Sequence, residues 1–231
     1  DGRIRVEKQT LPDGSATGFD FAGDASATGL TDDNFSAWFS YQPGIYTSQE
    51  TVPAGWDLTD ITCSDVEQEV GGSSGVTATG IATFDLQAGE DVTCTFTNTQ
   101  RAEITLVKNL PNDDGGTATQ DQFQAYLDAV TPGTTPVAWN TPIEVLPNVT
   151  YTAAEDTLPG YDPGNGWFNA CAANGEVTPG PGESLTCEIT NDDVAPVLTI
   201  IKTVVNDDGG SATAGMWNMD VTATNPSNTG F

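Results

Sequence analysis

The chain contains three lysines, and each stands near the end of a short segment of alternating apolar residues. These segments are residues 3–8, 103–108 and 198–202, and they end at Lys8, Lys108 and Lys202. Side chains of a β-strand alternate between its two faces, so each lysine shares a face with apolar residues. We therefore expect all three lysines to point toward a protein core.

Two other polar residues recur on apolar faces, a glutamate in the middle of a repeat and an asparagine near its end. They are Glu50 and Asn98 in the first repeat and Glu155 and Asn191 in the second. The same alternation predicts that each complete repeat directs one Lys, one Glu and one Asn toward its interior.

Such a buried set could form a covalent bond. Burial lowers the pKa of a lysine and raises that of a glutamate, which favours a neutral amine beside a protonated carboxyl group. The amine could then attack the asparagine carboxamide, so that ammonia leaves and a Lys–Asn isopeptide bond remains. The reaction would occur once per domain, which is maturation and not turnover. The alternative is a plain Lys–Glu ion pair, with the lysine reaching the rim of the strand.

The segments that carry these residues belong to repeats. Repeat one covers residues 1–100, repeat two covers 101–194, and repeat three begins at 195 and reaches only its first strands by 231. Each complete repeat has the size of a sandwich domain of about 100 residues. Short alternating segments between turns rich in Gly, Asn and Asp predict an all-β fold of tandem immunoglobulin-like or prealbumin-like β-sandwich modules. The linkers, 99–102 and 192–196, are short and predict a stiff string.

The order of these motifs resembles a known family. Lys in the first strand, Glu before Pro53-Ala-Gly-Trp56 or Pro159-Gly-Tyr161, and Asn in the last strand are similar to collagen-adhesin B-type, SpaA-like domains. Such prealbumin-like domains build stalks and shafts of bacterial adhesins and pili. The resemblance implies a cross-link between Lys8 and Asn98 assisted by Glu50, and one between Lys108 and Asn191 assisted by Glu155. Lys202 would find its partner outside this chain.

This resemblance implies a structural extracellular protein, either a rod-like stalk or a filament subunit. Its partners would be neighbouring copies or further repeats of the same protein. Repeat three would be completed by a longer chain or by a strand from a neighbour. The opening at Asp1 predicts a mature product or an excised fragment. The alternative function is an adhesin that binds glycan or protein ligands through exposed aromatic and acidic loops.

Four cysteines are divided equally between the two complete repeats: Cys63, Cys94, Cys171 and Cys187. This even distribution predicts disulfides and an oxidising compartment, with buried free thiols as the alternative. The pairs Cys63–Cys94 and Cys171–Cys187 would each staple one domain, although four cysteines allow three pairings.

The charge balance excludes several functions. The chain has 33 acidic residues, 6 basic residues and no histidine, for a formal net charge of −27. Such a surface repels phosphate backbones, so we expect no nucleic-acid partner. No apolar stretch of about 20 residues predicts a membrane span. No Ser/His/Asp or Cys/His set exists, so we expect no enzyme beyond the single autocatalytic reaction.

Two weaker predictions concern surface groups. Calcium is a candidate cofactor, because acidic turns offer hard oxygen ligands at Asp113, Asp114, Asp207 and Asp208. These turns lack the ligand spacing of an EF-hand, and turn formation alone explains their composition. Asn34 and Asn148 begin glycosylation tripeptides.

Overall fold

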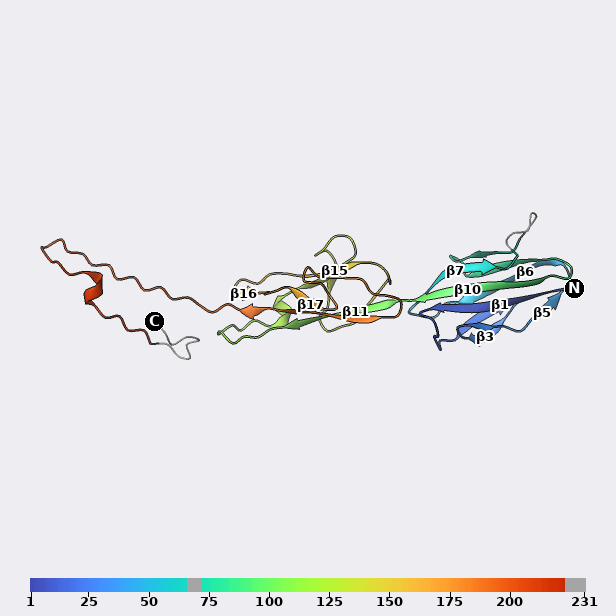
Figure 1. Cartoon of the computed structure of the whole chain (residues 1–231), viewed down its shortest axis with the longest axis horizontal. Coiled ribbons are helices and arrows are strands. Elements are labelled where there is room, and N and C mark those ends of the chain that lie inside the picture. Colours follow the sequence, from blue (N-terminus) through green and yellow to red (C-terminus); the bar gives the residue numbers. More distant parts are fainter. Residues whose placement is uncertain (66–71, 223–231) are drawn as a thin grey trace.

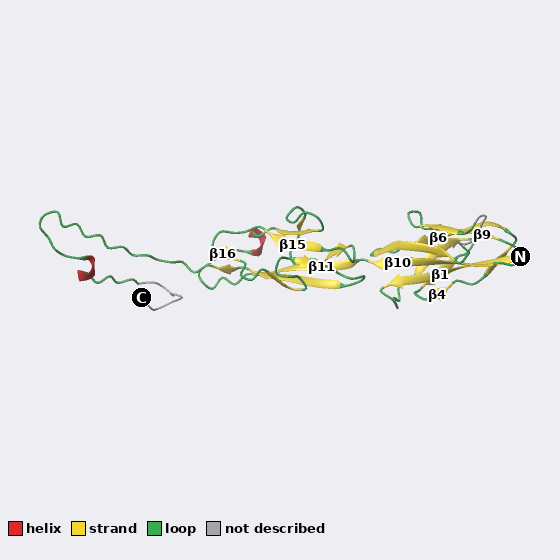
Figure 2. Ribbon diagram, turned by 45° about the horizontal axis from the view of Figure 1, so that its top comes forward, coloured by secondary structure: helices red, strands yellow, loops and turns green. Residues whose placement is uncertain are grey.

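The computed structural model describes residues 1–65 and 72–222. It shows two β-sandwich modules in a row, followed by an extended segment (Figure 1). Regular structure in the described residues consists of strands and two short 3-10 helices (Figure 2). No helix among these residues is long and apolar enough to cross a membrane.

Module one contains two packed sheets. The first has the order β4-β1-β10-β7, with β5 also paired to β1. Its strands are β1 (Gly2–Leu11), β4 (Asn34–Phe35), β5 (Phe39–Tyr41), β7 (Trp56–Cys63) and β10 (Asp91–Gln100). The second sheet has the order β3-β2-β6-β9-β8. Its strands are β2 (Phe19–Gly23), β3 (Ala27–Leu30), β6 (Gly44–Thr51), β8 (Ser74–Val76) and β9 (Ile81–Leu86).

Alternation along the strands forms the core of module one. Every second residue of β1 from Gly2 to Thr10 is buried, and β10 alternates in the same way as far as Asn98. The buried apolar side chains include Ile4, Phe19, Phe84 and Phe96. Because the period of a strand is two, Lys8 and Asn98 are carried inward with these apolar neighbours.

Module two repeats the central arrangement with shorter strands. One sheet has the order β14-β11-β19-β17, and a second has the order β13-β12-β15-β18. The first contains β11 (Ala102–Asn109), β14 (Ile143–Val145), β17 (Trp167–Asn169) and β19 (Ser184–Thr190). The second contains β12 (Ala125–Asp128), β13 (Pro136–Val137), β15 (Tyr151–Glu155) and β18 (Glu176–Val177). The 3-10 helix η1 (Gln120–Gln122) precedes β12, and a two-stranded sheet joins β16 (Tyr161–Asp162) to β20 (Asp192–Asp193).

The joint between the modules is shorter than the expected linker 99–102. Only Arg101 separates β10 from β11, because Thr99, Gln100 and Ala102 belong to strands. The Arg101 guanidinium donates to both carboxylate oxygens of Asp57 in module one, at 2.9 and 2.7 Å. It also donates to Glu144 in module two at 2.7 Å. The single connecting residue therefore bonds to both modules.

The expected first strand of repeat three, residues 198–202, is not formed. Residues 194–222 contain no strand, and residues 223–231 of that repeat lie outside the described residues. A strand requires a hydrogen-bonding partner, and no closing segment such as β10 or β19 follows residue 202 in this sequence. Local structure is nevertheless repeated. Asn206 Nδ2 donates to Ala212 O as Asn112 Nδ2 does to Ala118 O, and η2 (Ala214–Met216) matches η1.

Candidate cross-linking sites

Lys8, Glu50 and Asn98 meet inside module one, and we call this cluster site one. They come from β1, β6 and β10, and their exposed fractions are 0%, 5% and 0%. Lys8 Nζ donates to Asn98 Oδ1 at 2.7 Å and lies 3.5 Å from Glu50 Oε1. The lysine therefore touches the carboxamide and lies within ion-pair distance of the carboxylate.

The interior of module one changes the acidity of both ionisable groups. Burial lowers the pKa of Lys8 to about 8, and the nearby Glu50 carboxylate limits this fall. Burial also raises the pKa of Glu50, and Lys8 opposes the rise. Each shift favours the uncharged form, so burial lowers the cost of passing a proton from the lysine to the glutamate.

Site one also contains buried polar atoms that make no hydrogen bond, although Glu50 Oε1 lies within ion-pair distance of Lys8 Nζ. Within the described residues, neither carboxylate oxygen of Glu50 makes a hydrogen bond, nor does Asn98 Nδ2. Leaving a buried polar group unpaired costs about 1–3 kcal/mol, so such groups in a folded protein require an explanation.

Site two consists of Lys108, Glu155 and Asn191 in module two. Lys108 Nζ donates to Glu155 Oε2 at 2.5 Å, and Asn191 Nδ2 donates to Glu155 Oε1 at 2.7 Å. Burial lowers the pKa of Lys108, while Glu155 counteracts the change. Glu155 thus bridges the amine and the carboxamide, whereas in site one the amine contacts the carboxamide directly.

The strand register explains why both sites have the same members. In the parallel pair β1–β10, Lys8 lies opposite Phe96, and Asn98 is two residues further along. In the parallel pair β11–β19, Lys108 lies opposite Ile189, and Asn191 is again two residues further. An even offset keeps both side chains on the inward face, and the long lysine side chain spans the remaining distance.

Aromatic rings line both lysines, a feature that the sequence patterns did not indicate. Lys8 Nζ lies 4.2 Å from the centre of the Phe19 ring, and Lys108 Nζ lies 4.0 Å from that of Phe123. Lys202 is exposed and lies 4.6 Å from the Trp217 ring, with no glutamate or asparagine partner recorded in the described part of the chain. A partner for Lys202 outside this chain stays a prediction.

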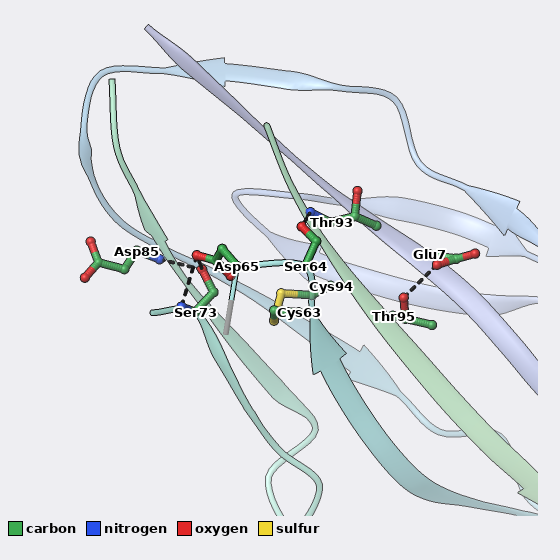
Figure 3. The surroundings of a disulfide bond; sticks show 9 residues. All are labelled: Glu7, Cys63, Ser64, Asp65, Ser73, Asp85, Thr93, Cys94 and Thr95. Atoms are coloured by element: carbon green, nitrogen blue, oxygen red, sulfur yellow. Dashed lines mark hydrogen bonds between the residues drawn. A yellow bond between two sulfur atoms is a disulfide. The ribbon is translucent and has the colours of Figure 1, made fainter. Parts of the chain in front are cut away.

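Each module contains one disulfide, which joins its two cysteines. Cys63 of β7 is bonded to Cys94 of β10, as Figure 3 shows, and Cys171 is bonded to Cys187 of β19. These are the within-repeat pairs, and no free cysteine remains. Beside the first disulfide, Ser73 donates twice to Asp65 and accepts a hydrogen bond from the Asp85 amide.

The calcium candidates do not form one cluster. Asp113 has carboxylate oxygens within 4.8 Å of Asp192 and Asp193, but among the described residues no such group includes Asp114, Asp207 or Asp208. Both oxygens of Asp193 already accept hydrogen bonds from the amides of Asp114 and Gly116, which closes the turn after β11. Calcium binding stays a prediction.

The glycosylation candidates lie on the surface. Asn34 is exposed in β4, and its amide nitrogen donates to Thr31 and to the Asp32 carbonyl. Asn148 is exposed in a turn with a φ of 59°. Attachment of a glycan at either position stays a prediction.

Comparisons with known proteins identify the class of these modules. Two family profiles, each described as a prealbumin-like fold domain, match residues 4–100 and 99–189. The chain therefore belongs to the SpaA-like family of prealbumin-fold domains, with two copies in tandem.

Several solved structures are similar to the chain. The Bacillus anthracis TIE protein is 18% identical, with 83% of this chain and 34% of that chain covered and a TM-score of 0.29. The pilus adhesin SpaC from Lactobacillus rhamnosus GG is 15% identical, with 83% and 31% covered and a TM-score of 0.29. The major pilin from Streptococcus pyogenes is 14% identical, with 83% and 97% covered and a TM-score of 0.26. The chain thus spans about a third of the first two structures. No curated protein matches it.

Proposed function

We propose that this chain is a load-bearing part of an extracellular stalk or pilus shaft, and that an isopeptide bond closes each module. The observation that carries the proposal is site one, where a buried lysine, glutamate and asparagine meet in the interior. Site two gathers the same residue types at the same register offset.

The chemistry balances without a cofactor. Lys8 transfers a proton to Glu50, and the neutral Nζ attacks Cγ of Asn98. The new C–N bond forms as the bond from Cγ to Nδ2 breaks. The Glu50 carboxyl group supplies a proton to the leaving nitrogen and takes one from the attacking amine, so ammonia leaves and Glu50 ends as the neutral carboxyl group that the first transfer produced.

The positions of Glu50 and Asn98 in site one support this reaction. The Glu50 carboxylate oxygens and Asn98 Nδ2 are the proton carrier and the leaving group, and neither makes a hydrogen bond. In site two Glu155 already contacts both reacting groups, the amine and the amide nitrogen. Amide formation replaces the lysine ammonium with an uncharged amide, and an uncharged group is less costly to bury than a charged one.

The strand order supports a mechanical role. The chain enters module one along β1 and leaves it along β10, and these two strands are parallel neighbours. Tension on the two ends would therefore shear them against each other. A bond between Lys8 and Asn98 would pass the load from strand to strand and leave residues 9–97 unloaded. Arg101 alone then separates β10 from β11, so the load enters module two directly.

The setting of this role is the cell surface. Disulfides are typical of proteins in oxidising environments, and both modules contain one. Further repeats or neighbouring copies of the same protein are the partners we propose for residues 195–222, which repeat the turn and 3-10 helix of module two.

A ligand-binding adhesin is the second candidate, and the aromatic residues of module one argue against it. Phe35 and Trp38 are two of the rings in module one that are not fully buried. The Arg5 guanidinium already lies 3.9 Å from the Phe35 ring centre and 4.3 Å from that of Trp38. The two rings are therefore used within the protein.

Stretching single molecules tests the load-bearing role. Under reducing conditions, the unaltered chain should resist tension without unfolding of either module. The Glu50→Gln/Glu155→Gln double variant should show two unfolding events. Two equal events in the unaltered chain would contradict the proposal.

A further inference from the structure

The two disulfides occupy the same place relative to the reacting asparagines. Cys94 lies four residues before Asn98, and Cys187 lies four residues before Asn191. Because four is an even number, each cysteine faces inward on the same side as its asparagine, with Asn191 one residue beyond the end of β19. Cys94 and Cys187 are both completely buried. Their partners differ in position, since the first bond spans 31 residues and the second 16. The spacing of four is thus the feature that the modules share.

The side chains of β10 do not determine its register by themselves. Its outward residues in the stretch before Asn98 are threonines, Thr93, Thr95 and Thr97. A slip of one residue would expose the apolar face and is therefore strongly disfavoured. A slip of two residues keeps apolar residues inside and threonines outside. Such a slip would nevertheless move Asn98 by about 7 Å along the strand axis relative to Lys8, so that the amine could no longer reach the carboxamide.

Pairing on the other side of the closing strand is irregular near the asparagine in module one and ends before it in module two. The register between β10 and β7 shifts between Thr97 and Asn98, directly beside the reacting residue. In module two, β17 pairs with only three residues of β19, and none lies beyond Ile189. The disulfides lie on this same side. Cys63 is the register partner of Cys94, so their bond excludes any slip of β10 against β7.

We propose that each disulfide is a positioning device for the cross-linking reaction of its own module, so that thiol oxidation must come before isopeptide formation. This inference depends on the proposed function, because it assumes that the isopeptide bond forms. The two cysteine pairs act by holding Asn98 at Lys8 in site one and Asn191 at Glu155 in site two, and they do not touch the reacting atoms. An external disulfide oxidises each pair. It accepts two electrons and two protons and leaves as two thiols.

The two modules provide a matched control within one chain. In the full chain with Cys63→Ala/Cys94→Ala, we expect the cross-link of module one to form roughly a hundredfold more slowly, as for other displaced reacting groups. The cross-link of module two should form at the normal rate. The Cys171→Ala/Cys187→Ala variant should show the reverse. Mass spectrometry of proteolytic fragments at successive times after synthesis measures both rates.

A disulfide also stabilises a fold, so the rate must be expressed per folded molecule. The folded fraction of the unaltered chain, synthesised and kept reduced, can be raised with sulfate and followed by the near-ultraviolet circular dichroism of its tryptophans. We expect slow ammonia release from the reduced folded chain and a rapid increase when oxidised glutathione is added. An unchanged rate per folded molecule would show that the disulfides only stabilise, and the inference would be wrong. If the oxidised, unaltered chain forms no cross-link in either module, the proposed function itself fails.

Discussion

Lys8 and Asn98 lie on neighbouring parallel strands with an offset of two residues, and the amine of one donates to the carboxamide oxygen of the other at 2.7 Å. Both side chains have an exposed fraction of 0%. This hydrogen bond connects the first and last strands of module one, β1 and β10, near the point where the chain passes into module two.

Replacement of Glu50 by Gln tests the role of the carboxyl group in site one. Glutamine has a similar shape but cannot accept the lysine proton, so cross-linking should slow by roughly a hundredfold or more. The uncross-linked module should also lose about 3–5 kcal/mol of stability, because the buried lysine loses its counter-charge. Intact mass and urea unfolding measure the two effects.

The control for this variant is Glu176→Gln, which changes an exposed glutamate of module two. It should show the same two-ammonia deficit from its own sequence mass as the unaltered chain, and the same unfolding midpoint. An unchanged cross-linking rate in Glu50→Gln would show that the Glu50 carboxyl group takes no part in the reaction.

The rate of cross-linking in module one should have a maximum in its pH dependence. The productive site holds one proton shared between Lys8 and Glu50. That proton is lost as pH rises through the Lys8 pKa of about 8, so the acid needed for the leaving group disappears. As pH falls below the raised pKa of Glu50, both groups are protonated and the amine is no longer a nucleophile. Timed mass measurements on freshly refolded chain give the profile, and a rate that rises steadily above pH 8 would contradict it.

Much of the two sites follows from the sequence because the strand period is two. Alternation places Lys8, Glu50 and Asn98 on apolar faces, and the internal repeat identifies the matching residues of module two. The alternation does not show which atoms meet. Site one pairs amine with carboxamide, whereas Glu155 bridges the two groups in site two. That difference depends on three-dimensional packing.

The prediction that residues 198–202 form a strand was wrong for a related reason. Leu198 to Lys202 has the same pattern as β1 and β11, but a strand also requires a neighbour that supplies hydrogen bonds. Arg101 illustrates the opposite case. Nothing in its local sequence indicates bonds to Asp57 and Glu144, because these partners are far away along the chain.

Arg101→Gln should loosen the joint between the modules. Exposed ion pairs contribute only about 0–1 kcal/mol each, so the unfolding of either module should hardly change. The glutamine cannot bond to Asp57 and Glu144 together, so the spread of distances between spin labels on the two modules should widen. High salt should widen it in the unaltered chain as well, because ions screen exposed charges.

Arg3→Gln is the matched control, since it removes another exposed Arg–Asp pair that lies within module one. It should leave the distance distribution unchanged. If the distances between the spin labels have the same distribution in the Arg101 variant and in the unaltered chain, the backbone alone sets the stiffness of the joint.

The most direct test of the central claim is the accurate intact mass of the reduced and denatured chain. Two isopeptide bonds predict a mass lower than the sequence mass by two ammonia molecules. The Glu50→Gln and Glu155→Gln variants should each show a deficit of only one. A mass equal to that of the sequence would show that Lys8 and Lys108 are ordinary buried ion-pair partners, and it would contradict the account.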